Sequence, residues 1–200
     1  MEEREYYGKY YEPLQELKGE VLQWLDDIVA AIAGEQGEVP VEHIRSRIKS
    51  PEGLQEKLKR KGLQENVEEA MCQISDIIGF RLVTHFVGDV YRIVQYIKED
   101  GRYTVIKEKD YISSPKQNGY RSYHVILECP FCGTENERLR VEIQIRTIAM
   151  DCWASLEHEM RYKKHIENAA LIEKELKRCA GEMASTDLSM QTLRDMIRKE

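Results

Sequence analysis

The chain has 200 residues, of which 42% are hydrophobic and 33% are charged, and its formal net charge at pH 7 is −6. A chain of this length can bury a core without disulfide or metal support, and an acidic balance disfavours non-specific binding to DNA. No stretch approaches the roughly 18 apolar residues of a membrane span, and the acidic start does not match a signal peptide, so we expect a cytoplasmic protein without a membrane partner.

Residues 1–38 are predicted to form a long N-terminal helix. Apolar side chains recur at spacings of three and four between residues 2 and 33, which indicates an amphipathic helix with one apolar stripe. Gly34 and Gly37 are expected to end this helix. The helix is longer than a core of this size requires, so we expect its stripe to pack against another subunit. The stripe consists of Leu14, Leu17, Val21, Leu25, Ile28 and Ile32.

Residues 39–165 are predicted to form one central domain in which strands and helices alternate. The expected strands cover residues 41–49, 80–86, 103–109, 122–129 and 138–147, and the expected helices cover 51–62, 65–73, 89–99 and 148–163. Helices packed on strands of mixed direction define an α/β or α+β fold. Residues 166–200 are expected to form a last, highly charged helix, which is a second candidate for a subunit contact.

The five cysteines are an odd set without a secretion signal, so we expect reduced thiols. Cys129 and Cys132 have the spacing of half a zinc site, but the sequence has no second C-x-x-C or H-x-H pair to complete four ligands. We interpret this segment as a hairpin tip in which Pro130 and Gly133 form the turn. The alternative is a metal ion shared between protomers.

Positive charge is concentrated in residues 41–61, where seven basic residues stand against three acidic ones. The sequence has neither a P-loop nor a G-x-G-x-x-G turn, so phosphates would have to be held by side chains. Arg47 and Lys49 share one face of the predicted strand. Lys57 and Arg60 share one face of the following helix, and the two faces can converge on one polyphosphate. The alternative is an ordinary solvated surface.

Two carboxylates are candidates for binding a divalent cation, which usually accompanies polyphosphate chemistry. Asp76 precedes an apolar strand, and Glu142 alternates with apolar neighbours, so its side chain is expected to point away from the core. Mg²⁺ is typically held by one or two carboxylates and keeps several waters. The alternatives are a cap or turn residue for Asp76 and an ordinary exposed strand residue for Glu142.

The loop over residues 113–124 is the most distinctive segment of the chain. Asn118 and Gly119 mark a turn with a positive φ. Tyr120 follows at the mouth of a strand, where its ring can stack on a base. Lys116 and His124 are placed to reach phosphate or ribose. The alternative is a plain loop into an edge strand, with packed aromatic side chains.

Several motifs follow one another in a fixed order over about residues 40–165. They are Ser46-Arg47-Ile48-Lys49, Asp76-Ile77-Ile78-Gly79-Phe80-Arg81, Lys109-Asp110-Tyr111-Ile112 with Asn118-Gly119-Tyr120-Arg121-Ser122-Tyr123-His124, and Val141-Glu142-Ile143-Gln144-Ile145-Arg146-Thr147 with Trp153-Ala154-Ser155-Leu156-Glu157-His158. In this combination the chain resembles the synthetase domain of the RelA/SpoT-homologue family, in particular its stand-alone small alarmone synthetases. The resemblance implies a mixed sheet of about five strands flanked by helices, related to nucleotidyltransferases, with residues 39–165 as the catalytic domain.

The resemblance also implies a role for each site residue. Adenine would lie between Arg47 and Arg81, and the ATP phosphates would contact Lys49, Lys57 and Arg60.

Asp76 and Glu142 are the implied catalytic pair. Both would bind Mg²⁺, and Glu142 would also orient or deprotonate the attacking hydroxyl group. The guanosine nucleotide would be bound by Tyr120, which stacks on its base, and by Lys116, Asn118 and His124.

The implied reaction is an in-line attack of the 3′-hydroxyl of GDP or GTP on the β-phosphorus of ATP, with AMP as the leaving group. Its product would be the alarmone (p)ppGpp of the stringent response. The sequence has no His-Asp dipeptide, which the hydrolase domain of longer family members needs, so we expect synthesis only. The alternative is a catalytically silent module of the same fold that binds nucleotide or RNA.

Small alarmone synthetases are commonly homotetramers built through the first and last helices, and the resemblance implies the same assembly here. One branch binds its own product in a central cleft. This chain departs from the residues of that cleft at His43, Arg45 and Asp151, so product activation is not expected. RNA is a further regulator that the resemblance leaves open.

Overall fold

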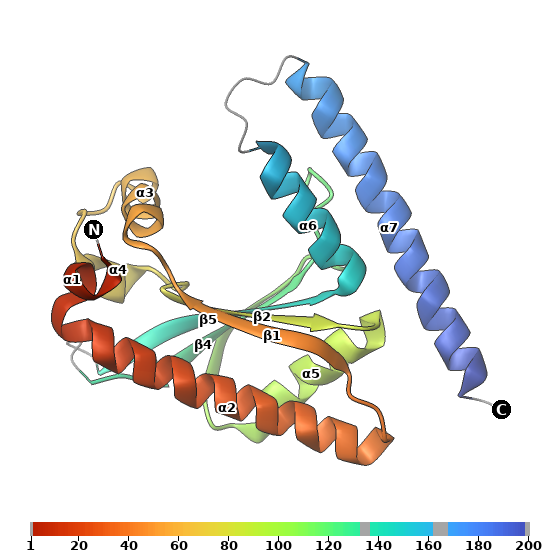
Figure 1. The fold of residues 1–200 in the computed structure, drawn as a ribbon, viewed down its shortest axis with the longest axis horizontal. Coiled ribbons are helices and arrows are strands. Elements are labelled where there is room, and N and C mark those ends of the chain that lie inside the picture. The colour runs from red at the N-terminus through yellow and green to blue at the C-terminus, as the bar shows by residue number, and fades with distance from the viewer. Residues whose placement is uncertain (1, 133–136, 162–167, 199–200) are drawn as a thin grey trace.

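One mixed sheet of five strands organises the molecule (Figure 1). A computed structural model describes residues 2–132, 137–161 and 168–198. The strands are β1 (Val41–Ile48), β2 (Ile78–Thr84), β3 (Thr104–Asp110), β4 (Tyr123–Pro130) and β5 (Arg138–Thr147). Their order is β1-β2-β5-β4-β3, in which β2 and β5 run parallel and all other neighbours are antiparallel. The predicted α+β fold with a five-stranded mixed sheet is confirmed.

Helices cover both faces of this sheet. The described helices are α1 (Glu3–Tyr7), α2 (Tyr11–Gln36), α3 (Pro51–Lys61), α4 (Val67–Gln73), α5 (Val87–Asp100), α6 (Ile148–Arg161) and α7 (Ala169–Ile197), with a 3₁₀ turn η1 (Gly8–Tyr10). In Figure 1, α2 and α5 lie under one face, whereas α3, α6 and α7 lie on the opposite side. None of the helices within the described ranges is both long and apolar enough to cross a membrane.

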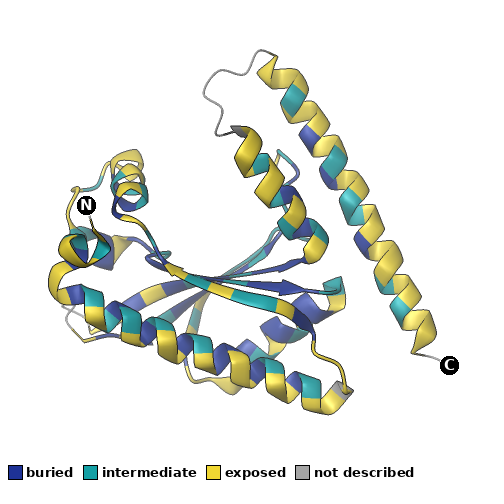
Figure 2. Cartoon of the chain, in the orientation of Figure 1, coloured by how far each residue is buried: buried dark blue, intermediate teal, exposed yellow. Residues whose placement is uncertain are grey.

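The N-terminal helix differs from its prediction in two ways. It is interrupted at Gly8, whose φ of 51° leaves the helical region, and of the two glycines expected to end it only Gly37 does so, as the left-handed C-cap. A glycine within a helix costs only about 1 kcal/mol, so Gly34 does not end α2. The apolar stripe of α2 is buried in this chain's own core, with Leu14, Val21 and Leu25 fully covered (Figure 2). The stripe therefore provides no support for a contact with another subunit.

Most of the central elements agree with the prediction, with shifted ends. The bounds of β5 are confirmed, and the Ser50 hydroxyl caps α3 by accepting from the Gly53 amide at 3.2 Å. β2 begins at Ile78, two residues earlier than predicted, because Ile78 already pairs with Ile48 on one side and Val141 on the other.

The cysteine segment ends β4. Cys129 is buried, Cys132 is exposed, and both are free thiols. Burial raises the pKa of Cys129 to about 12, so it stays protonated at neutral pH. Pro130, which was predicted to lie in the turn, is instead the last residue of β4 and pairs with Arg138, whereas Gly133 lies outside the described residues. Within the described part of the chain no group of three or more potential ligands could hold a metal ion, so the shared-metal alternative stays a prediction.

Candidate active site

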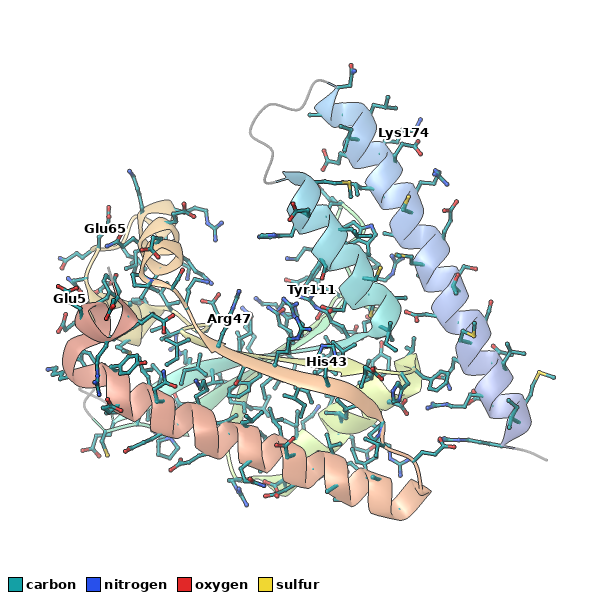
Figure 3. The ribbon with its side chains drawn as sticks, in the orientation of Figure 1. Glu5, His43, Arg47, Glu65, Tyr111 and Lys174 are labelled. Atoms are coloured by element: carbon teal, nitrogen blue, oxygen red, sulfur yellow. The ribbon has the colours of Figure 1, made fainter. Side chains whose placement is uncertain are left out.

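Polar side chains line the face of the sheet that lies opposite α2 and α5. Directly paired residues of neighbouring strands share a face, and the register pairs Arg47 with Gly79 and Gly79 with Glu142. Gly79 has no side chain, and a Cβ there would meet no atom within 4 Å. The sheet therefore leaves open space between Arg47 and Glu142. Figure 3 shows Arg47 and Tyr111 on the α3 and α6 side of the sheet.

A cavity of about 270 Å³ occupies this space. Asp76, from the loop before β2, and Glu142, from the middle of β5, both line it, although 65 residues separate them in the chain. The structure thus brings the two predicted carboxylates together. The lining residues are Arg45, Ser46, Arg47, Asp76, Gly79, Phe80, Arg81, Glu142 and Gln144.

Two lysines hold the Asp76 carboxylate. Lys49 Nζ lies 3.0 Å from Oδ2, and Lys57 Nζ lies 2.7 Å from Oδ1. Burial alone would raise the pKa of Asp76, but these ammonium groups lower it, so the group is ionised at neutral pH. One charged cluster is therefore formed by three predicted site residues: Lys49 just after β1, Lys57 on α3 and Asp76 in the loop before β2. Arg60 is not part of it, because its side chain is exposed in the last turn of α3.

A second cavity of about 390 Å³ lies next to the first. Arg47 and Arg81 line both, so the two predicted adenine-binding arginines form a shared wall. Tyr120 lines the second cavity together with Arg146. The remaining lining residues come from α6 and are Ala154, Ser155, Glu157 and His158.

The loop that carries Tyr120 is fixed at its start by Asp110. The Asp110 carboxylate accepts hydrogen bonds from the backbone amides of Ile112 and Ser113, each at 2.9 Å. Lys116 Nζ then lies over two aromatic rings, 4.8 Å from the centroid of Tyr111 and 4.7 Å from that of Tyr120. Burial and the positive charge of Lys109 lower the pKa of Lys116. A cation placed beside an aromatic platform suits an anionic nucleotide whose base stacks nearby.

Asn118 shapes the turn of this loop. Its Oδ1 accepts from the Tyr120 amide at 3.2 Å, and its Nδ2 donates to Glu157 Oε1 at 3.2 Å. Gly119 adopts a φ of 91°, as the Asn-Gly pattern predicted. The predicted contact of Asn118 with the guanosine nucleotide stays a prediction, since its side chain here joins the loop to α6.

A chain of hydrogen bonds runs from Arg146 to Glu142. Arg146 Nη2 donates to the Tyr120 hydroxyl at 2.8 Å, and this hydroxyl lies 2.9 Å from His124 Nε2. The ionised Glu142 carboxylate can only accept, so the His124 proton sits on Nδ1, and the unprotonated Nε2 accepts from the Tyr120 hydroxyl. Nδ1 lies 3.4 Å from Glu142 Oε1. The buried imidazole therefore presents its donor to the carboxylate.

This arrangement keeps Glu142 ionised. Burial alone would raise its pKa, but the hydrogen bonds from His124 and Gln144 lower it to about 2. The Gln144 amide donates to Glu142 Oε2 at 2.9 Å. Burial lowers the pKa of His124, so the imidazole is neutral at pH 7, in agreement with the tautomer above. Glu142 is consequently a preoriented carboxylate that is ionised at neutral pH.

Three further residues were not predicted for the site. Gln144 and Arg146 stand two and four residues after Glu142, so strand alternation puts them on the same face, but it gives neither a role. Asp151 was considered only for a product cleft, yet its carboxylate lies 3.2 Å from Arg81 Nη1 and 3.1 Å from Arg146 Nη1. No sequence signal pairs Asp151 with Arg81, because the contact depends on how α6 leaves β5.

A mixed sheet with two carboxylates among basic side chains, beside an aromatic platform, defines a nucleotide-binding enzyme of the phosphoryl-transfer class. The family described as "Region found in RelA / SpoT proteins" matches residues 46–167. The chain belongs to this RelA/SpoT family.

Individual relatives agree with this assignment. The GTP pyrophosphokinase YwaC of Bacillus subtilis is 45% identical over 145 residues, which cover 72% of this chain and 69% of YwaC. The structure of small alarmone synthetase 1 from B. subtilis, bound to its product pppGpp, matches with a TM-score of 0.82 at 29% identity and covers 93% of this chain and 95% of that one. The structure of small alarmone synthetase 2 from the same organism matches with a TM-score of 0.76 at 38% identity. It covers 94% of this chain and 100% of that one.

Proposed function

We propose that this chain is a (p)ppGpp synthetase that transfers pyrophosphate from ATP to the ribose 3′-hydroxyl of GDP or GTP and releases AMP. The observation that carries the proposal is the convergence of Asp76, Glu142 and four arginines on adjoining cavities, namely Arg45, Arg47, Arg81 and Arg146. The relatives named above, a GTP pyrophosphokinase and two small alarmone synthetases, support the same reaction.

The donor set fits Mg²⁺. Asp76 and Glu142 line one cavity, and both are ionised oxygen ligands. Asp76 Oδ1 is buried and has no hydrogen bond of good geometry in the described part of the chain, although Lys57 lies close to it. Two carboxylates leave the other positions of an octahedral ion to water and phosphate oxygens. When bound, Mg²⁺ would neutralise charge on the phosphates during the transfer.

The chain's own residues would prepare both reactants. Arg47 and Arg81 would bind adenine in the shared wall of the cavities, and Lys49 and Lys57 would turn from Asp76 to the triphosphate. The lysines are near enough to make this exchange because both now hold Asp76, which lines the cavity. Positioning and charge neutralisation supply most of the catalysis in phosphoryl transfer.

Glu142 would act on the acceptor. Its carboxylate would accept the proton of the ribose 3′-hydroxyl as the new bond from O3′ to the β-phosphorus forms. The bond between the β-phosphorus and the α,β-bridging oxygen breaks, and that oxygen leaves with AMP. His124 and Gln144 would hold Glu142 in place for this step, while Tyr120 would stack on the guanine base with Lys116 near its phosphates.

Label transfer tests the proposal. Purified protein is incubated with Mg²⁺, γ-labelled ATP and GDP, and the nucleotides are separated. We expect the label on a guanosine nucleotide in its 3′-position, and omission of GDP should abolish that product. Label confined to ATP, while ATP still binds, would contradict the proposal and favour the silent nucleotide- or RNA-binding module instead.

Assembly is a second part of the proposal. We propose a homotetramer in which α7, more than α2, forms the contact between subunits. Only Leu176, Ala180 and Asp187 are buried among the described residues of α7. Large apolar side chains of this helix are instead exposed, namely Leu171, Leu188, Met190, Leu193, Met196 and Ile197.

A further inference from the structure

One carboxylate in α6 holds two arginines from different strands. Asp151 Oδ1 lies 3.2 Å from Arg81 Nη1, on β2, and 3.1 Å from Arg146 Nη1, on β5. Arg146 is only 4% exposed. A buried guanidinium group requires a charged partner, and two of them side by side repel each other, so Asp151 is needed by both. Burial and the charge of Arg146 lower the pKa of Arg81, and Asp151 opposes this effect.

The same cluster reaches the acceptor side of the site. Arg146 Nη2 donates to the Tyr120 hydroxyl at 2.8 Å, and the guanidinium carbon lies 5.2 Å from the centroid of the Tyr120 ring. Arg81 lines both cavities, whereas Tyr120 lines the second. A continuous path of direct contacts therefore joins the wall of the first cavity to the aromatic platform of the second.

We infer that Asp151 and Arg146 are positioning residues that couple the two nucleotide subsites, so that a nucleotide bound in one subsite strengthens binding in the other. The inference rests on the proposed function for the identity of the two ligands. A nucleotide that contacts Arg81 restricts the Arg81 side chain. Because Arg81 and Arg146 share the partner Asp151, Arg146 is restricted as well. Arg146 then holds Tyr120 in place, and the second nucleotide no longer has to order this platform.

Such coupling is reciprocal and measurable. If ATP raises the affinity for GDP by some factor, GDP raises the affinity for ATP by the same factor. A residue that only supports the fold would change both affinities or the stability, but not their mutual dependence. The coupling factor is therefore the readout that separates the positioning role from a purely structural one.

Isothermal titration calorimetry in Mg²⁺ measures this factor. The dissociation constant of α,β-methylene-ATP is determined with and without saturating GDP, and that of GDP with and without the analogue. We expect at least a fivefold tightening for the wild-type chain. Asp151→Asn keeps the shape but removes the charge, and Tyr120→Phe keeps the ring but removes the hydroxyl group. Both should lower the factor to about one, and the factor is a ratio that does not depend on how each substitution changes the affinity for a single nucleotide.

A matched control lies on the same helix. Glu159 is exposed on α6, so Glu159→Gln should leave the coupling factor unchanged. Thermal melts show which variants are folded, and if Asp151→Asn does not fold, Tyr120→Phe decides. A wild-type factor of one, or an unchanged factor in a folded variant, would overturn the inference and leave the proposed function intact. Failure of the wild-type chain to bind either nucleotide would overturn both.

Discussion

At the scale of single residues, the site depends on side chains whose charge is set by their neighbours. Glu142 is the clearest case, because His124 and Gln144 donate to its two oxygens. Sequence alternation predicted that Glu142 points away from the core, and the structure confirms it. The neighbours were beyond prediction, since His124 comes from β4 and meets Glu142 only through the pairing of β4 with β5.

Removal of this carboxylate should abolish turnover. Glu142→Gln keeps the side-chain shape but loses the proton acceptor, so kcat should fall by about 100-fold or more, while ATP still binds through the arginines and lysines. Steady-state kinetics and calorimetry measure the two effects separately. Glu128→Gln on β4, which removes a partly exposed ion pair with Arg138, is the control and should retain activity. Turnover near the wild-type rate in Glu142→Gln would refute the role given to Glu142.

The low pKa of Glu142 also predicts how stability depends on pH. Its pKa is about 2 in the folded chain, against an ordinary value of 4.5. A carboxyl group with a depressed folded pKa stabilises the fold above its unfolded pKa, and this contribution is lost as the pH falls from about 4.5 towards 2.

Urea unfolding at pH 6 and pH 3 measures this loss. The free energy of unfolding should fall by on the order of 2 kcal/mol more in the wild-type chain than in Glu142→Gln. Equal losses in the two proteins would show that Glu142 is not held as an anion in the folded state.

At the scale of elements, α7 supports the loop that carries Tyr120. Arg121 Nη1 donates to the carbonyl oxygens of Gly119, at 3.2 Å, and of Ala180 on α7, at 3.1 Å. The helix is also tied to the end of β5, because Asp187 accepts from Thr147, and to α5, because Arg194 pairs with Asp89. The last helix is thus part of the catalytic body of this chain, whichever role it has between subunits.

A methyl group at position 119 tests this support. A Cβ on Gly119 would lie 2.7 Å from Ala180 Cβ and 3.3 Å from Lys177 Cα, and φ is positive there. Gly119→Ala should therefore push the loop from α7, destabilise the fold by about 1–3 kcal/mol and raise the KM for GDP more than that for ATP.

Gly101 provides the matched control for this substitution. Its φ is also positive, at 72°, but a Cβ there meets no atom within 4 Å. Gly101→Ala should therefore show the cost of backbone strain alone, without any effect on KM. Thermal denaturation and steady-state kinetics compare the two variants. Equal changes in stability and in KM for Gly119→Ala and Gly101→Ala would contradict the contact with α7.

Element types followed from the sequence wherever apolar periodicity and caps agreed. α3 is an example, because Ser50, Pro51 and Gly62 mark both of its ends. Pattern alone could not say what covers an apolar stripe: that of α2 was assigned to another subunit and packs on the chain's own sheet. Asp76 and Glu142 meet because β5 lies parallel to β2, a pairing that no local signal encodes.

At the scale of the whole molecule, α7 stands out as the most exposed long element (Figure 2). Leu188 is 62% exposed and Leu193 is 53% exposed, although α5 contacts the same stretch of α7 through Gln191 and Arg194. We predict that a second copy of the chain covers Leu188 and Leu193.

Light scattering after size exclusion tests the assembly. The wild-type chain should elute as a tetramer, and Leu188→Glu with Leu193→Glu should lower the mass without unfolding the protomer, because both side chains are exposed. Val39→Glu, at an exposed residue before β1, should leave the mass unchanged. A monomeric wild-type chain, or a double variant with unaltered mass, would contradict a contact through α7.

In the proposed reaction, two carboxylates and the surrounding basic residues direct a ribose hydroxyl to the β-phosphorus of ATP. The identity of the leaving group reports the attacked atom directly. Quantitative ³¹P NMR of a reaction with ATP, GDP and Mg²⁺ should show one AMP formed for each guanosine nucleotide that gains a 3′-diphosphate. Formation of ADP or orthophosphate in place of AMP would mean that the γ-phosphorus is attacked, and the account would be wrong.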